Sequence, residues 1–157
     1  MFLLTTWSGC KVNYTDPSPD DINIFDIATA LSRECRYAGH ASHFYSVAQH
    51  SVLCSRIVSP ELAVEALLHD AAEAYLGDVP SPLKRTPEFA GYRATEQRLQ
   101  TVIYAAFGLY GGEEPPVVKE YDFRLLRTEQ AQLMPPAVNC GDIRDDGENF
   151  RRAFRMA

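Results

Sequence analysis

The sequence lacks the features that mark several classes of protein. Its 157 residues have four cysteines but no C-x-x-C pair, and no apolar run is long enough to cross a bilayer. The N-terminus has no basic segment followed by a long apolar stretch, so no secretion signal is expected. We therefore expect reduced thiols, a cytoplasmic location and no membrane partner.

Positive charge is also scarce. Fifteen Lys and Arg residues stand against twenty-one Asp and Glu residues, which gives a formal net charge of -6. A protein that binds duplex nucleic acid must neutralise many phosphates, so this balance argues against a nucleic-acid polymer as partner. A small anion held by a metal ion and a few local cations remains compatible with it.

Repeats, low-complexity tracts and strand-helix alternation are absent, whereas 46% of the residues are hydrophobic. This length and hydrophobic content predict a single domain over residues 1–157 with its own core. Apolar residues recur at helical spacing along most of the chain, which predicts an all-α bundle. The expected helices cover residues 22–33, 46–58, 60–76, 87–107, 116–134 and a short stretch at 149–156. Residues 2–14 are β-prone on both sides of Ser8-Gly9 and predict a small hairpin.

The most unusual stretch is residues 66–78, which read ALLHDAAEAYLGD. An apolar helix and its exit here carry four ionisable side chains, His69, Asp70, Glu73 and Asp78. Because buried charges must be paired or bound to a metal, this concentration indicates a functional site.

The ends of that helix have recognisable signals. Ser59 suits an N-cap, Pro60 suits the first helical position, and Gly77 suits a left-handed C-cap. These signals predict one continuous helix over residues 60–76. His69 and Glu73 would then share a face, because they lie four residues apart.

Two further candidates lie on neighbouring helices. His50 lies on the apolar stripe of the 46–58 helix, where a core histidine is the common alternative to a ligand. The short turn at Ser59-Pro60 favours antiparallel packing, which would bring His50 toward His69 and Asp70.

Asp122 lies at the edge of the apolar stripe of the 116–134 helix, where a carboxylate needs a partner. From this helix alone, an ion pair with Arg124 or Arg127 is as good an explanation as a functional role.

Cations and aromatic side chains gather in two segments beside these candidates. The loop over residues 33–45 contains Arg36 and Tyr37, which suit an anion and a ring, although an ordinary surface loop is an equal alternative. Lys84 and Arg85 follow two prolines and are expected on a stiff, extended segment.

Two histidines and two aspartates form a mixed nitrogen and oxygen set suited to a divalent ion such as Co, Mn, Zn, Ni, Fe or Mg. They are His50, His69, Asp70 and Asp122. Such an ion would lower the pKa of bound water and neutralise charge on phosphoryl oxygens. Glu73 and Asp78 would remain free to orient the water or return a proton to the leaving oxygen. The predicted chemistry is phosphoester or phosphoanhydride hydrolysis.

The spacing of these residues resembles a known family. His50-Ser51, then His69-Asp70-x-x-Glu73-x-x-x-x-Asp78-x-Pro80-x-Pro82-x-Lys84, then Val118-Lys119-x-x-Asp122 are similar to the metal-binding pattern of the HD-domain phosphohydrolases. Within that family, residues 44–51 and the Trp7-Ser8-Gly9 start most resemble phage relatives of the 5'-deoxynucleotidase branch, including dATP triphosphohydrolases.

The resemblance implies an HD-domain helical bundle and a role for each candidate. It implies metal ligands at His50, His69, Asp70 and Asp122, catalytic carboxylates at Glu73 and Asp78, an Arg-aromatic pair at Arg36 and Tyr37, and phosphate contacts at Lys84 and Lys119. The implied substrate is a small deoxynucleotide, dATP or dAMP before others. A homo-oligomer, dimer or hexamer, in a bacterial or phage-infected host cytoplasm is also implied. The alternatives are a general deoxynucleoside 5'-monophosphatase, a signalling-nucleotide hydrolase and a sensor.

Overall fold

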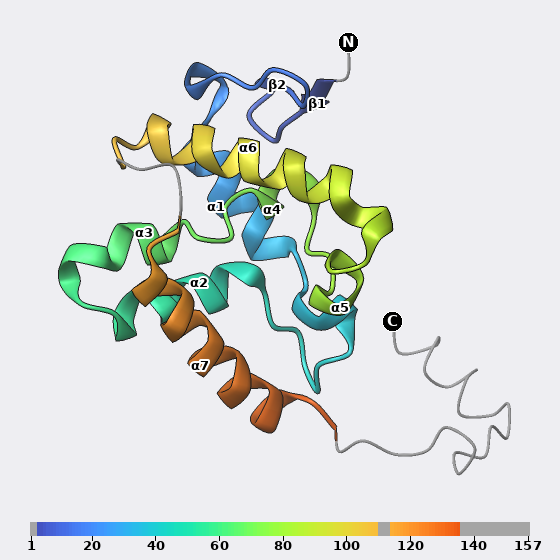
Figure 1. Ribbon diagram of the computed structural model, residues 1–157, viewed down its shortest axis with the longest axis vertical. Helices are drawn as coiled ribbons and strands as arrows, with labels where there is room; N and C mark the ends of the chain where they lie inside the picture. The colour runs from blue at the N-terminus through green and yellow to red at the C-terminus, as the bar shows by residue number, and fades with distance from the viewer. Residues whose placement is uncertain (1–2, 110–113, 136–157) are drawn as a thin grey trace, which may run out of the picture.

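The computed structural model describes residues 3–109 and 114–135, and these form seven α-helices and one two-stranded sheet (Figure 1). The expectation of a mainly helical protein with a small N-terminal hairpin is confirmed. The helix expected over residues 149–156 lies outside the described residues. Within the described ranges, no helix is both long enough and apolar enough to cross a membrane.

The hairpin consists of β1 (Leu3–Thr5) and β2 (Lys11–Asn13), which pair antiparallel with Leu4 opposite Val12. Its turn contains Gly9 at φ 88°, a left-handed conformation that glycine adopts readily. Val12 is fully buried in the main core. A lone hairpin has too little buried surface to be stable, so this contact is needed.

Asp26 in α1 (Ile24–Arg33) fastens the hairpin turn to the helix. Its buried carboxylate accepts hydrogen bonds from Thr6 Oγ1 at 2.7 Å, Ser8 Oγ at 2.6 Å and the Ser8 N–H at 2.8 Å. Burial by itself would raise the pKa of Asp26, but these hydrogen bonds outweigh it and lower the pKa.

The starts of α1 and α2 (Val47–Ile57) are set by local caps. The Asn23 side chain accepts from the Phe25 N–H, so α1 begins two residues later than expected. Ser46 and Gln49 form a reciprocal capping box at the start of α2. Between the hairpin and α1, residues Pro19–Asp21 make a 3-10 turn.

The prediction of one continuous helix over residues 60–76 is wrong. The segment divides into a 3-10 turn (Pro60–Leu62), α3 (Ala63–Leu67) and α4 (Glu73–Leu76). His69 and Asp70 lie in the turn between α3 and α4, so His69 and Glu73 are not one helical turn apart on a shared helix face.

The break is explained by Gln100 of α6 (Ala90–Ala106). Its amide Nε2 donates to the Leu68 carbonyl at 2.7 Å, and its Oε1 accepts from the Ala72 N–H at 3.1 Å. In an unbroken helix the Ala72 N–H would bond directly to the Leu68 carbonyl. The Gln100 amide therefore takes the place of that helical hydrogen bond.

The prediction of an extended segment at Lys84 is also wrong, because Ser81–Lys84 forms the short helix α5. The Pro80 carbonyl accepts from the N–H groups of Leu83 and Lys84. Pro82 lies in the first turn of α5, where a missing N–H costs no helical hydrogen bond. Next, Pro87–Phe89 forms a 3-10 turn ahead of α6, which reaches its expected end near Gly108.

The main core is enclosed by α1, α2, α4, α6 and the turn that contains Ala71 and Ala72. A smaller apolar cluster joins α2, α3 and α7 (Pro116–Leu133), which confirms the last long helix. In Figure 1, α6 lies between the hairpin and the pair α1 and α4, and α2 and α7 lie on the other side of that pair. The buried stripe of α2 contains Val47 and Cys54 together with His50, which was expected there, whereas Ile57 is exposed and Val58, just after the helix, is buried.

Candidate metal centre

Three elements converge on one cluster of possible metal ligands. α2 supplies His50, the turn after α3 supplies His69, and α7 supplies Asp122. The Nε2 atoms of His50 and His69 are 3.3 Å apart, and Asp122 Oδ1 lies 3.1 Å from His50 Nε2. All three donor atoms lie within 4.8 Å of one another, so the cluster could hold a metal ion.

Hydrogen bonds on the far side of each ring fix which nitrogen faces the cluster. His50 Nδ1 lies 2.8 Å from Glu129 Oε1, and His69 Nδ1 lies 2.7 Å from the Ala66 carbonyl. Both partners are acceptors, so each Nδ1 carries the hydrogen and each Nε2 is left for a cation. Metal-ligating histidines are held in this way, and the donor set therefore fits a divalent ion.

Without a metal ion, protons are the cations available to this cluster. Burial lowers the pKa of His50, but its hydrogen bonds to Asp122 and Glu129 outweigh burial and raise the pKa. The pKa of His69 is raised well above its ordinary value, because Asp70 and Asp122 outweigh its burial. Burial alone would raise the pKa of Asp122, yet the two histidines hold it far below the usual range.

Asp70 lies at the edge of the cluster. Its Oδ2 is 3.2 Å from His69 Nε2, 3.8 Å from His50 Nε2 and 3.2 Å from Arg36 Nη1. Burial alone would raise its pKa, but the charges of His69, His50 and Arg36 hold it far below the usual range. The structure thus brings all four predicted ligands together, with Asp70 shared between the histidines and Arg36.

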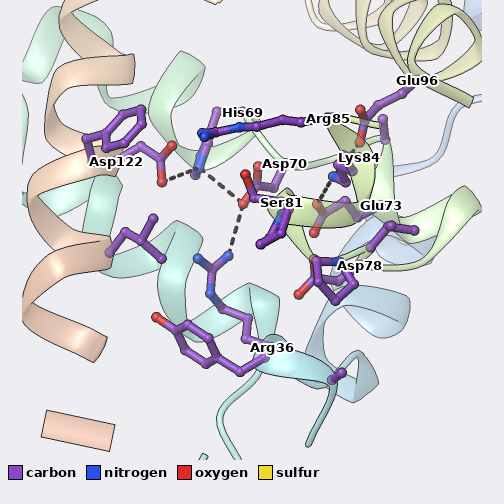
Figure 2. Close-up of a pocket in the computed structure, with 18 of the residues that line it drawn as sticks. Arg36, His69, Asp70, Glu73, Asp78, Ser81, Lys84, Arg85, Glu96 and Asp122 are labelled. Carbon is purple, nitrogen blue, oxygen red and sulfur yellow. Dashed lines mark hydrogen bonds and ion pairs between the residues drawn. The ribbon is translucent and has the colours of Figure 1, made fainter. Parts of the chain in front are cut away.

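A cavity of about 840 Å³ opens beside this cluster (Figure 2). A volume of this size suits a ligand as large as a nucleotide. Nine of the ten site residues predicted from the sequence line it, and the tenth, His50, is fully buried. Figure 2 shows His69 between Asp70 and Asp122, with Arg36 on Asp70 and Lys84 beside Glu73.

The two predicted catalytic carboxylates have raised pKa values. Burial, with the nearby Asp70, raises the pKa of Glu73 well above its usual range, although Lys84 partly opposes the shift. Glu73 Oε1 accepts from Lys84, whereas its buried Oε2 has no hydrogen-bond partner among the described residues. Burial also raises the pKa of Asp78, with Arg36 and Lys84 acting in the opposite direction.

Both predicted phosphate-binding lysines are already paired with carboxylates. Lys84 Nζ lies 2.8 Å from Glu73 and 2.7 Å from Glu96. Lys119 Nζ lies 2.9 Å from Asp122 and 3.4 Å from Glu114. Each lysine therefore faces the cavity with much of its charge compensated.

The ion pair between Asp122 and Arg124 or Arg127, which the sequence left open, is not what the structure shows. Asp122 pairs with His50 and Lys119, and Arg124 pairs with Glu120 at 2.8 Å. Asp122 is accordingly directed to the cluster.

The loop with Arg36 and Tyr37 begins with an unusual backbone. Tyr37 (φ 58°) and Ala38 (φ 51°) are both left-handed, a conformation that costs energy for residues with a Cβ atom. The Arg36 guanidinium is buried and lies 5.6 Å from the centre of the Tyr37 ring. The Tyr37 hydroxyl donates to Glu129 at 2.9 Å.

Sequence reasoning missed four residues at the site, and these are Glu96, Gln100, Glu114 and Glu129. Glu129 had a usable signal, because it follows Asp122 by seven residues and so returns to the same face of the helix. Gln100 lies between Leu99 and Ile103 on the buried side of α6, but nothing in its local pattern indicates its partner.

Fold and site together define a helical protein with a largely buried His/His/Asp cluster that could hold a metal ion, beside a cavity of about 840 Å³. No family model matches the chain. It is, however, 48% identical over 137 residues to the uncharacterized protein YfdR of Escherichia coli, which covers 85% of this chain and 73% of YfdR. An uncharacterized protein of Rhodobacter capsulatus is 33% identical over 138 residues, covering 80% of this chain and 70% of the relative. The chain belongs to the YfdR family.

Proposed function

We propose that this protein is a metal-dependent phosphohydrolase of the HD-domain type that removes phosphate from the 5' position of deoxynucleotides, with dATP or dAMP preferred. One observation carries the proposal. His69 and Asp122 belong both to the possible metal cluster and to the wall of the 840 Å³ cavity. A purely structural metal site would be closed off, whereas this one borders a space for a ligand.

The spacing that resembles the HD-domain family supports the assignment of roles. His50, His69, Asp70 and Asp122 would hold the ion, which when bound lowers the pKa of water and neutralises phosphoryl charge. Glu73 and Asp78 would handle the protons of the attacking water and the leaving oxygen. Their raised pKa values suit general acid-base work, which is most efficient when the pKa is near the working pH.

The remaining cavity residues would hold the rest of the substrate. Arg36 and Tyr37 would contact the sugar and base, because they line the cavity as a guanidinium beside an aromatic ring. Lys84 and Lys119 would meet the phosphates.

A general deoxynucleoside 5'-monophosphatase is a second candidate. It is favoured by the pairing of Lys84 with Glu73 and Glu96, and of Lys119 with Glu114 and Asp122. Such pairing leaves less positive charge for a triphosphate chain than two free lysines would.

The test is a substrate screen with product analysis. The protein is stripped of metal with a chelator, reloaded separately with Co, Mn, Zn, Ni, Fe or Mg, and incubated with deoxynucleoside and ribonucleoside mono-, di- and triphosphates. Chromatography then distinguishes release of phosphate from release of triphosphate. We expect dATP or dAMP to be the best substrate and ribonucleotides to be poor ones. No hydrolysis with any ion would contradict the proposal.

Two variants separate metal binding from turnover in the same screen. His69→Ala should retain no metal and no activity. Glu73→Ala should keep the metal but lose about a hundred- to ten-thousand-fold in turnover, the usual contribution of general acid-base catalysis. Activity within about threefold of the parent at equal metal content would reject that role for Glu73.

A further inference from the structure

Glu129 is a buried carboxylate on α7 that the proposed chemistry does not use. Only 4% of its surface is exposed. Its Oε1 lies 2.8 Å from His50 Nδ1 and accepts from the Tyr45 hydroxyl at 2.6 Å. Its Oε2 accepts from the Tyr37 hydroxyl at 2.9 Å and lies 3.5 Å from Arg36 Nε.

The two oxygens therefore serve two parts of the site. Oε1 faces the imidazole of a possible metal ligand, and Oε2 faces the loop that lines the cavity. No other carboxylate in the described part of the chain contacts both His50 and Tyr37.

We propose that Glu129 is a positioning residue that fixes His50 for metal binding and holds the Tyr37 loop in the same arrangement. The first part requires only that the cluster binds a metal ion. The second part rests on the proposed function, because it concerns the substrate.

The geometry at His50 gives the first reason. A carboxylate on Nδ1 keeps the hydrogen on that nitrogen, orients the ring and makes Nε2 a better ligand. Replacing such an outer partner weakens metal binding by about 10- to 100-fold in metalloproteins generally.

The backbone of the loop gives the second reason. Tyr37 and Ala38 are both in the left-handed region, and such conformations persist only where surrounding contacts hold them. The hydrogen bond from the Tyr37 hydroxyl and the nearby Arg36 guanidinium join this strained segment to Glu129. The ring of Tyr37 is thereby kept on the cavity wall.

The test compares Glu129→Gln with Glu120→Gln, the same change at an exposed position on α7 where the side chain pairs with Arg124. Affinity for Zn²⁺ is measured by competition with a coloured chelator, after circular dichroism has shown that each variant is folded. We expect Glu129→Gln to bind Zn²⁺ about 10- to 100-fold more weakly than the parent, and Glu120→Gln to bind it as the parent does.

Tyr37→Phe tests the second part of the proposal, that Glu129 holds the Tyr37 loop in place. It removes the hydroxyl from Glu129 but leaves the contact with His50, so Zn²⁺ affinity should stay at the parental value while KM for the deoxynucleotide rises. If Glu129→Gln does not fold, Glu129→Asp carries the test, since it keeps the charge, shortens the reach by one methylene and should also weaken Zn²⁺ binding.

The outcomes separate this inference from the proposed function. Parental Zn²⁺ affinity in a folded Glu129→Gln or Glu129→Asp protein would show that Glu129 does not position His50 for metal binding. An unchanged KM in Tyr37→Phe would overturn the proposal that Glu129 holds the Tyr37 loop for the substrate. If Zn²⁺ affinity falls as expected but the parent hydrolyses no deoxynucleotide, the proposed function fails and the role of Glu129 toward His50 stands.

Discussion

At the scale of single residues, the charged side chains of the site are arranged as shared pairs. Lys84 contacts Glu73 and Glu96, while Asp70 contacts His69 and Arg36. Changing one residue therefore alters the pKa of a neighbour as well as removing a contact.

Lys84→Gln should move the acid limb of the pH-activity profile to higher pH. Lys84 lowers the pKa of Glu73 against the larger effect of burial, so its loss raises that pKa further. A base must be deprotonated to act, so activity would then begin at higher pH. The measurement is kcat/KM against pH at saturating metal.

Lys119→Gln is the matched control for that profile. Lys119 pairs with Asp122 and Glu114 rather than with Glu73, so the acid limb should stay in place even if the rate falls. An unmoved limb in Lys84→Gln would mean that Glu73 is not the group that titrates.

Tyr37→Ala should weaken binding of a purine deoxynucleotide by about 1–3 kcal/mol, the usual size of an aromatic-base stack. It should also blur the preference among bases, because the ring is the aromatic plane in the loop that borders the metal cluster. Competition assays with the four deoxynucleotides measure both effects. A variant with the parental base ranking would show that specificity is set elsewhere.

At the scale of elements, the turn between α3 and α4 depends on a side chain from α6. Gln100 joins the Leu68 carbonyl to the Ala72 N–H, and His69 and Asp70 lie between those two groups. The helix is thus interrupted at the point where the two side chains must reach the cluster.

Gln100→Leu should lower the free energy of unfolding and weaken metal binding together. It leaves the buried Ala72 N–H without a partner, which costs about 1–3 kcal/mol, and it removes one of the two hydrogen bonds that the Leu68 carbonyl accepts, the other being from the Ala71 N–H. Urea unfolding and Zn²⁺ competition provide the two readouts. Gln97→Leu, at an exposed position one turn earlier on α6, is the control and should change neither. Parental Zn²⁺ affinity in Gln100→Leu would mean that the turn holds its shape without this amide.

The same turn shows where prediction from sequence ends. Apolar periodicity predicted the positions of α1, α2, α6 and α7, because this signal is local. The break after α3 depends on a glutamine about thirty positions further along the chain, which no local pattern reveals. For α5, the two prolines predict an extended segment, but the first turn of a helix also accepts proline, and the structure has a short helix there.

The sequence predicted the residues of the site better than it predicted the backbone that holds them. His50, His69, Asp70 and Asp122 were expected together, and the structure places them together. Glu129 and Gln100 were missed because their importance lies in which atoms they contact, and contacts between distant segments are set only by tertiary packing.

At the scale of the whole molecule, the cluster joins segments that are far apart in the sequence. α2, the turn after α3 and α7 meet at His50, His69 and Asp122. A cation bound there would link these segments to one another and stabilise the folded chain.

That stabilisation should increase as the pH rises. The pKa values of His50 and His69 are raised in the folded, metal-free protein. Their protonation therefore contributes its full stability below about pH 6.5, the unfolded value, and the contribution is lost as the pH rises through the folded values. A metal ion needs neutral imidazoles, so it binds better as the protons leave.

The measurement is the Tm with and without Zn²⁺ at about pH 6 and about pH 8, on either side of the ordinary histidine pKa. The increase in Tm on adding Zn²⁺ should be larger at the higher pH, and His69→Ala should show no increase at either. An equal or smaller increase at the higher pH would show that protons and the ion do not compete for this cluster.

The attachment of the hairpin turn to Asp26 has a consequence for amide hydrogen exchange. The Ser8 N–H is bonded to a carboxylate on α1, so it cannot meet solvent unless the hairpin separates from that helix. The two strands and the start of α1 should therefore exchange their amide hydrogens as one cooperative unit. In an Asp26→Ala protein the Ser8 amide should exchange faster while the amides of α6 keep their protection.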